Sequence, residues 1–252
     1  MNQQDIQNVA RVLLEARASG QPLQPEASEP APRSTEDAYA VHAELMRELG
    51  EIGGWKIGAP SAQADSMYAP LPAAGLHASP ARLPASSHPL RGIEVEVAFI
   101  LGSDLPARPK PYALEEIVAA VHSVVPVIEE VESRLRDRGQ AGPMWALADL
   151  QSHGALISGT PIPGWLGLKT ESLHVRLCFD DAVIIDRECH NRGGDPLVQL
   201  QRLANSVGPR YGGLKAGQIV TTGSLTGLDT APAGARVRAE LEGLGEVSLS
   251  FE

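Results

Sequence analysis

Cysteine and positive charge are both scarce in this chain. Its 252 residues include only two cysteines, Cys178 and Cys189, which excludes the disulfide framework of small secreted domains and leaves no close spacing of the kind that structural zinc sites use. The 21 Lys and Arg residues stand against 31 Asp and Glu, a formal net charge of −10, and no run of basic residues could follow a phosphate backbone. We therefore expect no nucleic acid partner.

Long apolar runs are also missing. No stretch approaches the roughly 20 residues of a membrane-spanning helix, and the first residues, MNQQD, lack the basic-then-apolar order of a signal peptide. The expectation is a cytoplasmic protein with no membrane partner. The hydrophobic fraction of 43% and the charged fraction of 21% are those of a globular protein, and the length suits one core, with or without a small appendage.

Two amphipathic helices are predicted before residue 53. The first ends near Gly20. The second follows a proline-rich, irregular connector at 21–33 and begins behind Ser34, whose hydroxyl can cap it while Asp37 reaches back as in a capping box. Their apolar stripes are Ile6, Val9, Leu13 and Ala16 in the first and Ala38, Val41, Leu45 and Leu49 in the second. We expect residues 1–52 to form an N-terminal helical appendage.

Short apolar runs separated by Gly and Pro predict a sheet-rich domain over residues 53–252. Helices are expected at 113–123 and at 195–207, where Asp195 can cap the helix and Pro196 occupies its first turn. Strands are expected at 54–58, 93–101, 124–131, 154–158, 173–179, 182–186, 218–222, 235–241 and 246–251. The expected fold class is α+β, with a mixed, mostly antiparallel β-region.

Two acids interrupt the strand-like alternation of residues 92–101, GIEVEVAFIL. Because successive side chains of a strand alternate faces, Glu94 and Glu96 share one face and the apolar residues line the other. Two carboxylates side by side repel each other unless water or a cation intervenes, and such pairs supply oxygen ligands to hard divalent ions. The alternative is that both acids face water from a half-buried strand, an ordinary outcome of such alternation.

A third acid occurs in the run VVPVIEEVESR at 124–134. In a strand, Glu129 shares its face with valines, whereas Glu130 and Glu132 lie opposite. Burying a lone carboxylate costs several kcal/mol, and a metal ion could serve as its partner. The alternative is a Glu that bends to solvent at a strand end or pairs with Arg134.

Lys56 lies among glycines in the run GGWKIG at 53–58, where the backbone can approach a ligand closely. A lysine there can neutralise a carboxylate or relay a proton. Lysines on short strands are usually solvated, so this feature alone leaves both interpretations open.

Taken in order, several segments resemble the 2-keto-4-pentenoate hydratase family, which includes 4-oxalocrotonate decarboxylase and belongs to the wider fumarylacetoacetate hydrolase fold. They are GWKIG (54–58), IEVEVAF (93–99), VIEEVESR (127–134), ALAD (146–149), LAN (203–205), LKAGQIVTTGSLTG (214–227) and LGEVSLSF (244–251). The resemblance runs from about residue 35 to residue 252. It implies a β-roll of the fumarylacetoacetate hydrolase C-terminal type as the catalytic domain.

The resemblance also implies roles for particular residues. Glu94, Glu96 and Glu129 match positions that hold Mg²⁺ or Mn²⁺, and Lys56 matches a lysine beside the substrate. Proton transfers at two substrate carbons are expected of Lys56 and Asp149. Asp149 could instead cap a helix or occupy a turn. Ser224 is expected to bind the substrate carboxylate, or else to be a turn hydroxyl in a Gly-rich segment.

The activity implied is metal-dependent hydration of a 2-hydroxy-dienoate or 2-oxo-alkenoate, a small-molecule 2-oxo acid, in aromatic-compound catabolism. The alternatives are a 4-oxalocrotonate-type decarboxylase, a carbon-carbon-bond hydrolase, or a non-catalytic partner subunit. The resemblance further implies a homo-oligomer, with possible association to a pathway enzyme. No second basic residue is anchored near the motifs, since His122, His153 and Arg134 have no assigned place, and this favours a monoacid hydratase with an apolar distal pocket.

The chain departs from the family pattern around the expected pocket. Where an Asp-Tyr-Gly-like run is common, residues 65–71 read DSMYAPL, so the acid is absent or displaced to Asp65. Leu150 stands in place of Asn, Arg202 in place of Trp, and His42 in place of Gln. We therefore expect a retained metal site and an altered substrate pocket.

Overall fold

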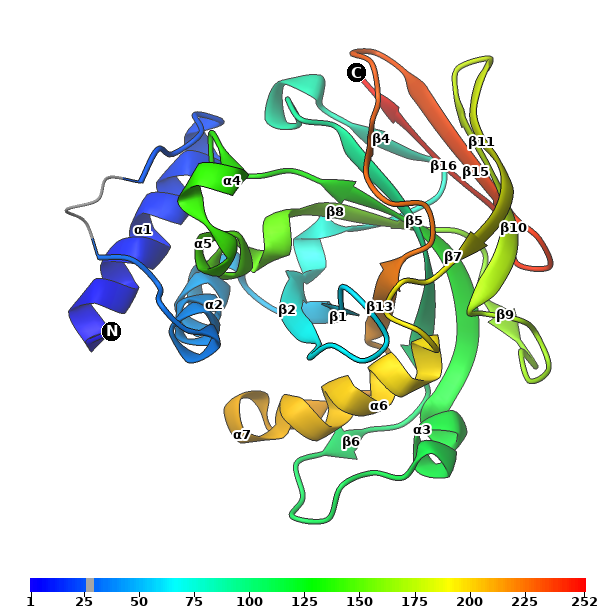
Figure 1. Ribbon diagram of the computed structural model, residues 1–252, viewed down its shortest axis with the longest axis horizontal. Helices are drawn as coiled ribbons and strands as arrows, with labels where there is room; N and C mark the ends of the chain where they lie inside the picture. The colour runs from blue at the N-terminus through cyan, green and yellow to red at the C-terminus, as the bar shows by residue number, and fades with distance from the viewer. Residues whose placement is uncertain (26–29) are drawn as a thin grey trace.

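The computed structural model describes residues 1–25 and 30–252, and β-sheet dominates it (Figure 1). The strands are β1 (Ile52–Gly58), β2 (Met67–Pro72), β3 (Leu76–Ala78), β4 (Ala81–Leu83), β5 (Gly92–Leu101), β6 (Leu105–Pro106), β7 (Val121–Val131), β8 (His153–Ser158), β9 (Ile162–Pro163), β10 (Ser172–Phe179), β11 (Ala182–His190), β12 (Gly213–Leu214), β13 (Ile219–Ser224), β14 (Asp229–Thr230), β15 (Arg236–Leu241) and β16 (Gly245–Phe251). All the strands expected from the sequence are present, with ends shifted by a few residues.

The strands form two main sheets. The larger follows the order β2-β1-β13-β5-β7-β8-β3, with β14 added beside β5 and β9 beside β7, and the smaller follows β11-β10-β15-β16-β4. The pairs β1·β13, β3·β8 and β4·β16 are parallel, and the other described pairs are antiparallel. This confirms the α+β class with a mixed, mostly antiparallel β-region.

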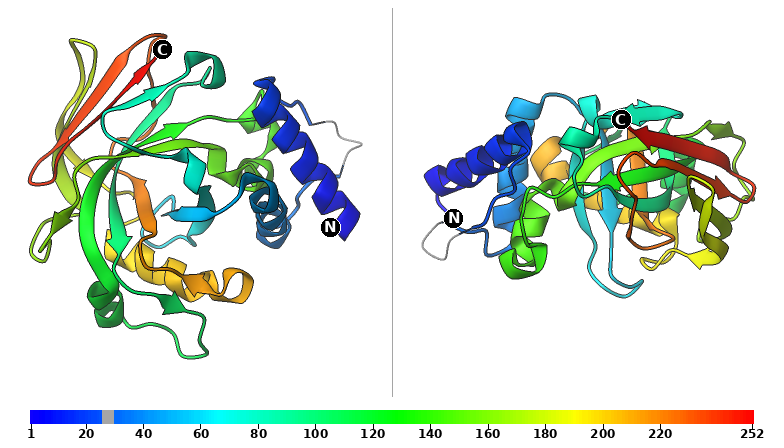
Figure 2. Two further views of the ribbon diagram at one scale, coloured as in Figure 1. Left: turned by 180° about the vertical axis from the view of Figure 1, so that it is seen from behind. Right: turned by 90° about the horizontal axis from the view of Figure 1, so that it is seen from above.

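Helices lie at one end of the larger sheet and across it. They are α1 (Gln3–Ser19), α2 (Thr35–Leu49), α3 (Leu114–Ala120), α4 (Arg138–Ala141), α5 (Pro143–Ala148), α6 (Pro196–Ser206) and α7 (Gly208–Tyr211), with the short turns η1 (Ala73–Gly75), η2 (Ala85–Ser87) and η3 (Leu150–Ser152). In Figures 1 and 2, α1, α2 and α5 gather at the N-terminal side, and the smaller sheet lies at the opposite side.

Two sequence expectations about local structure are wrong. The helix expected at 113–123 ends at Ala120, because Val121 and Ser123 already pair with β5 and continue as the long strand β7. The segment 65–71, for which no strand was expected, largely becomes β2, an antiparallel neighbour of β1. In both cases, pairing with a strand outside the segment decides a conformation that the local sequence leaves ambiguous.

The two N-terminal helices pack against the sheet domain. Tyr39 of α2 stacks on Tyr68 of β2 with ring centroids 4.2 Å apart, and Leu13 and Leu45 join the same core as Trp55. Ser34 caps α2 as expected, whereas the Asp37 carboxylate accepts from the backbone N–H of Arg33.

The boundary expected at residue 52 remains a prediction. Residues 26–29 of the expected connector lie outside the described residues. Among the described helices, none is both long and apolar enough to cross a membrane.

Strand β5 is covered on both faces. Its Ile93, Val97 and Phe99 side chains enter the main core, while Ala98 on the opposite face joins a second apolar cluster with Leu71, Val125, Val127, Leu156 and Ile219. The acid-bearing face of β5 and β7 therefore does not look onto open water. Glu96 is 3% exposed and Glu129 is fully buried.

Candidate active site

Strand register brings three carboxylates together. Glu94 of β5 lies directly opposite Glu129 of β7, and Glu96 follows two residues along on the same face. One carboxylate oxygen from each of the three lies within 4.8 Å of the others. The residues that the sequence predicted as metal ligands thus form one cluster, with Glu94 the most accessible of the three.

Lys56 reaches this cluster from β1. Its Nζ donates to Oε1 of Glu129 at 2.5 Å and to the carbonyl oxygen of Gln151 at 3.2 Å. The Gln151 carbonyl is presented by the turn η3, in which Leu150, Gln151 and Ser152 all have positive φ, at 49°, 52° and 60°. Three consecutive non-glycine residues in the left-handed region carry strain that surrounding contacts must offset.

Glu96 is held by β13. Its Oε2 accepts from the hydroxyl of Thr221 and, at 3.1 Å, from the backbone N–H of Gly223. Gly223 has φ of +103°, a conformation that turns the strand at this point and that other residues rarely adopt. The sequence element TTGS at 221–224 is therefore required locally by the geometry around Glu96.

The three carboxylates and Lys56 line a pocket of about 330 Å³. Its wall also includes Ser224 and the residues Gly58, Ala59, Pro60, Met67, Arg138, Gln151, Asn191, Arg192, Gly193 and Gly227. Ser224 thus reaches the pocket as predicted, although its Oγ also accepts from the backbone N–H of Gly227 at 2.9 Å. The position of Ser224 is therefore compatible with both interpretations, a substrate-binding hydroxyl and a turn hydroxyl.

Electrostatics in the cluster favour a cation. Burial, with the charges of Glu129 and Glu94, raises the pKa of Glu96 to about 8, and burial with Glu129 raises the pKa of Glu94. Burial also disfavours the charge of Glu129, but Lys56 and His153 together outweigh burial and lower the pKa of that carboxyl. Oε2 of Glu129 is buried with no hydrogen-bond partner in the described part of the chain. A divalent ion fits this oxygen-only donor set.

Metal affinity should therefore rise with pH. Below about pH 8, Glu96 carries a proton that an ion must displace, so we expect Mg²⁺ affinity to increase roughly tenfold per pH unit from about pH 6 and to level off above about pH 8. Titration calorimetry in buffers of different ionisation enthalpy measures both the affinity and the proton released. Thr221→Val removes a hydrogen bond that lowers this pKa, so its plateau should move to higher pH. A dissociation constant independent of pH would contradict the prediction.

Asp149, predicted as an acid or base, does not reach the pocket. Its carboxylate accepts from Nε of Arg134 at 2.5 Å and from the backbone N–H of the same residue at 3.0 Å, and both side chains are at most 5% exposed. Arg134 also donates to the carbonyl oxygens of Asp149 and His153, each at 2.9 Å. The pair braces the start of η3, whose Gln151 carbonyl accepts from Lys56.

The sequence did not identify two arginines that line the pocket. Arg138 begins α4 and Arg192 follows β11, and both are exposed at the pocket wall. Neither lies within a motif shared with the family resemblance, so only their placement in space reveals them. The expectation of no second basic residue near the motifs is therefore wrong. The argument for an apolar distal pocket, which depended on that expectation, is wrong as well.

The other basic candidates lie elsewhere. His153 is buried, with Nδ1 3.5 Å from Oε1 of Glu129, and burial lowers its pKa to about 4. His122 is exposed near the start of β7. Neither histidine lines the pocket of Lys56.

Arg202 binds the loop at 59–66, which leads into β2 and overlaps the start of the segment that departs from the family pattern. It donates to the carbonyl oxygens of Ala62 and Ala64 at 2.9 and 3.2 Å and to the hydroxyl of Ser66 at 3.1 Å. Asp65 in this segment is exposed and does not line the pocket. Arg202, which replaces the Trp common in the family, and the loop before β2 are therefore joined by hydrogen bonds.

His42 and Leu150, the remaining departures, are both buried. Nε2 of His42 lies 2.6 Å from the carbonyl oxygen of Leu147, a hydrogen bond between α2 and α5. Leu150 belongs to the left-handed turn η3. These two residues thus affect packing near the site without lining it.

Comparisons with known proteins show what this chain is similar to. Residues 35–251 match the family model described as fumarylacetoacetate (FAA) hydrolase C-terminal. The 2-hydroxyhexa-2,4-dienoate hydratase of Comamonas testosteroni is 26% identical over 270 residues, covering 99% of this chain and 98% of that enzyme. A 4-oxalocrotonate decarboxylase of Pseudomonas sp is 28% identical over 160 residues, covering 63% of this chain and 59% of that enzyme.

A solved structure has the same fold along the whole chain. The 4-oxalocrotonate decarboxylase from Pseudomonas putida G7, complexed with magnesium and adipate, matches with a TM-score of 0.87 at 21% identity and covers 100% of this chain and 99% of that one. This similarity extends through the N-terminal helices, beyond the part matched by the family model.

Proposed function

This chain belongs to the fumarylacetoacetate hydrolase C-terminal family, and on that premise we propose that it is a divalent-metal-dependent hydratase of a 2-hydroxy-dienoate or 2-oxo-alkenoate. The observation that carries the proposal is the cluster of Glu94, Glu96 and Glu129 beside Lys56 in one pocket. Relatives named as hydratases align over nearly their whole length, which supports the same reaction class.

The three glutamates would hold the ion, and a bound divalent ion would act as a Lewis acid that stabilises an enolate formed from a 2-oxo acid. Mg²⁺ or Mn²⁺ suits the oxygen-only donors. Lys56, as an ammonium beside three carboxylates, offsets their charge and attracts the carboxylate of the substrate. It is also the pocket's best-placed proton donor to a substrate carbon. We assign Asp149 a positioning role in place of direct proton transfer, because its carboxylate is bound to Arg134.

The pocket favours a substrate with a second negative group. Arg138 and Arg192 lie in the same wall as Lys56, and each can form a charge-assisted hydrogen bond with a carboxylate. The structurally similar decarboxylase is complexed with adipate, itself a dicarboxylate. We therefore propose a 2-oxo-enedioate or its dienol, with its 2-oxo acid end at the glutamates and its distal carboxylate at the arginines.

The alternative is decarboxylation, which the relatives named 4-oxalocrotonate decarboxylase represent. Loss of carbon dioxide is easier where the environment disfavours the charge of the departing carboxylate. Two arginines beside that carboxylate would stabilise it in the ground state. This favours hydration over decarboxylation in this pocket.

A substrate panel tests the proposal. The purified protein with Mg²⁺ should consume 2-hydroxydienoates and 2-oxo-enedioates, followed by ultraviolet absorbance, without releasing carbon dioxide. Arg192→Leu should lower kcat/KM for the dicarboxylate by about tenfold, the order of one charged hydrogen bond, and leave the monocarboxylate unchanged. Arg187→Leu, an exposed arginine on β11 outside the pocket, is the matched control.

Two other outcomes would each support a different function. Stoichiometric carbon dioxide release would establish the decarboxylase. No turnover of any member of the panel would support a non-catalytic partner subunit. The proposal includes a homo-oligomer, as the family resemblance implies, a cytoplasmic location, and a small-molecule 2-oxo acid as the ligand.

A further inference from the structure

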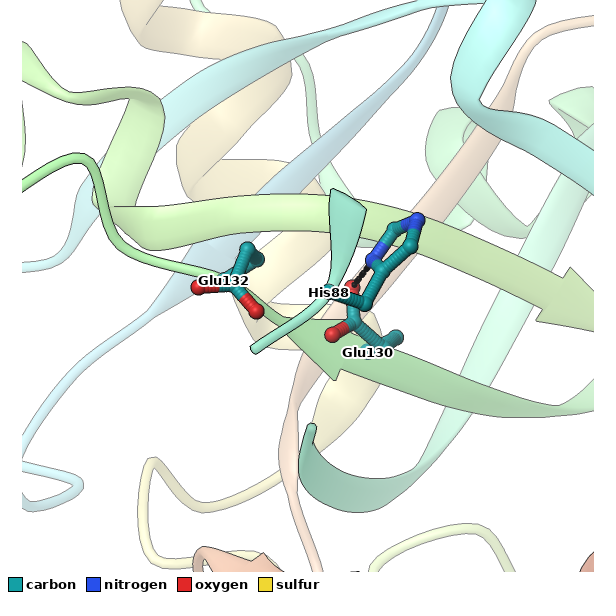
Figure 3. A group of neighbouring side chains, drawn as sticks. All are labelled: His88, Glu130 and Glu132. Carbon is teal, nitrogen blue, oxygen red and sulfur yellow. Dashed lines mark hydrogen bonds and ion pairs between the residues drawn. The ribbon is translucent and has the colours of Figure 1, made fainter. Parts of the chain in front are cut away.

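Strand β7 carries acids on its other face as well. Glu130 and Glu132 project away from Glu129, toward the segment that follows η2, where His88 meets them. Figure 3 shows the imidazole of His88 against the carboxylate of Glu130, with Glu132 to one side of them. One donor atom from each of the three lies within 4.8 Å of the others. This cluster has no role in the proposed hydratase chemistry.

The cluster is buried and incompletely paired. Nδ1 of His88 lies 2.7 Å from Oε2 of Glu130, and Oε2 of Glu132 accepts from the backbone N–H of Leu90 at 2.8 Å. Glu130 is fully buried and Glu132 is 7% exposed. Oε1 of Glu130 is buried and has no hydrogen-bond partner in residues 1–25 and 30–252. A buried carboxylate oxygen without a partner costs free energy that a ligand would recover.

The lack of a side chain at Gly154 of β8 makes room for the side chains of Glu130 and Glu132. A Cβ there would lie 2.0 Å from Oε2 of Glu130 and 2.8 Å from Cβ of Glu132. Only glycine at this position of β8 lets both carboxylates pack against the strand. The observed position of the Glu130 side chain therefore requires a glycine at residue 154.

A single imidazole does not balance two buried carboxylates. Arg17 and Arg134 also border the adjoining pocket of about 260 Å³, together with His77, but Arg134 is paired with Asp149. Both guanidinium groups donate to the carbonyl oxygen of His153, each at 2.9 Å. Within the described residues, neither guanidinium forms an ion pair with Glu130 or Glu132.

We propose that His88, Glu130 and Glu132 form a second metal site, selective for Zn²⁺. One imidazole nitrogen and two carboxylates are the donor types that zinc accepts, in a tetrahedral arrangement with a fourth position for water. Ideal tetrahedral donors lie roughly 3.3 Å apart, and the donor atoms of these three side chains lie within 4.8 Å of one another. The fourth position would face the adjoining pocket, which His88 and Glu132 both line. Such an ion would join the η2–β5 connection to the end of β7.

The two sites differ in the ions they prefer. The cluster of Glu94, Glu96 and Glu129 offers oxygen alone, which suits Mg²⁺ and Mn²⁺, whereas an imidazole donor shifts preference toward Zn²⁺. Zn²⁺ can also enter an oxygen-only site, so the number of ions bound must be resolved site by site. Variants that disable each cluster separately provide this resolution.

The experiment measures Zn²⁺ retained by the full-length protein after equilibrium dialysis, with metal quantified by mass spectrometry. The wild type should hold two equivalents, Glu129→Gln one, His88→Ala one, and the double variant none. Glu130→Gln, which keeps the shape of the side chain, should lose the same equivalent as His88→Ala. His174→Ala, an exposed histidine of β10, is the matched control and should retain two.

Thermal unfolding in the Glu129→Gln background provides a second readout. Zn²⁺ should raise its midpoint, and adding His88→Ala should abolish the rise. A wild type that binds a single equivalent, lost in Glu129→Gln and unaffected by His88→Ala or Glu130→Gln, would overturn the second site. The same result would leave the proposed hydratase site intact, so the two proposals fail separately.

Discussion

Glu129→Gln should reduce metal-dependent turnover by about 10³-fold or more while the protein remains folded. Lewis-acid stabilisation of transition-state charge is worth several kcal/mol, and each 1.4 kcal/mol corresponds to roughly tenfold in rate. Gln preserves the shape of the side chain and can still accept from Lys56. Removing the charge of Glu129 also relieves its repulsion with Glu94 and Glu96, which favours retention of the fold.

The measurement combines turnover, Mg²⁺ stoichiometry and circular dichroism on the same preparation. Glu240→Gln makes the same chemical change at a half-buried position of β15 outside the pocket, so it should leave all three unchanged. Unchanged activity together with unchanged Mg²⁺ stoichiometry in Glu129→Gln would refute the assignment of this cluster as the metal site.

Asp149→Ala should destabilise the protein by about 3–5 kcal/mol, because removing one partner leaves the Arg134 charge buried and unpaired. At roughly 2–4 °C per kcal/mol for a chain of this size, the thermal midpoint should fall by about 10 °C. The loss also releases the Asp149 end of η3, which presents its Gln151 carbonyl to Lys56. Turnover below the unfolding transition should therefore fall with an unchanged pH profile.

Two measurements distinguish a structural role of Asp149 from a catalytic one: unfolding in denaturant and turnover at low temperature. Combining Asp149→Ala with Arg134→Met should recover part of the stability, since the unpaired charge is then absent. Asp149→Asn with normal stability, a large loss of kcat and an altered pH profile would instead return Asp149 to the role of acid or base.

Much of the fold could be predicted from the sequence because its main signals are local. The alternation in β5 and the stripes of α1 and α2 each repeat within a single element, and burial follows their period. The segments 67–72 and 121–123 lack such a signal. Their conformation depends on pairing with β1 and β5, which lie outside these segments.

The site could be predicted in part for a similar reason. Glu94 and Glu96 lie two residues apart on one strand, so their shared face follows from strand geometry alone. The position of Glu129 opposite Glu94 and the contact of Lys56 with Glu129 depend on the strand order β1-β13-β5-β7, which no local pattern encodes. The family resemblance implied the roles of these residues but not this order.

By itself, the sequence determined the identity and spacing of the acids, the helical and strand periods, and the absence of disulfide, nucleic-acid and membrane-span signals. Only the tertiary structure decided which acids share a pocket, that Asp149 is bound to Arg134, and that Arg138 and Arg192 line the pocket of Lys56. The physical reason is that charge and hydrogen bonding act over a few ångströms in space. Residues such as His88 and Glu130, 42 positions apart, become neighbours only when the sheet forms.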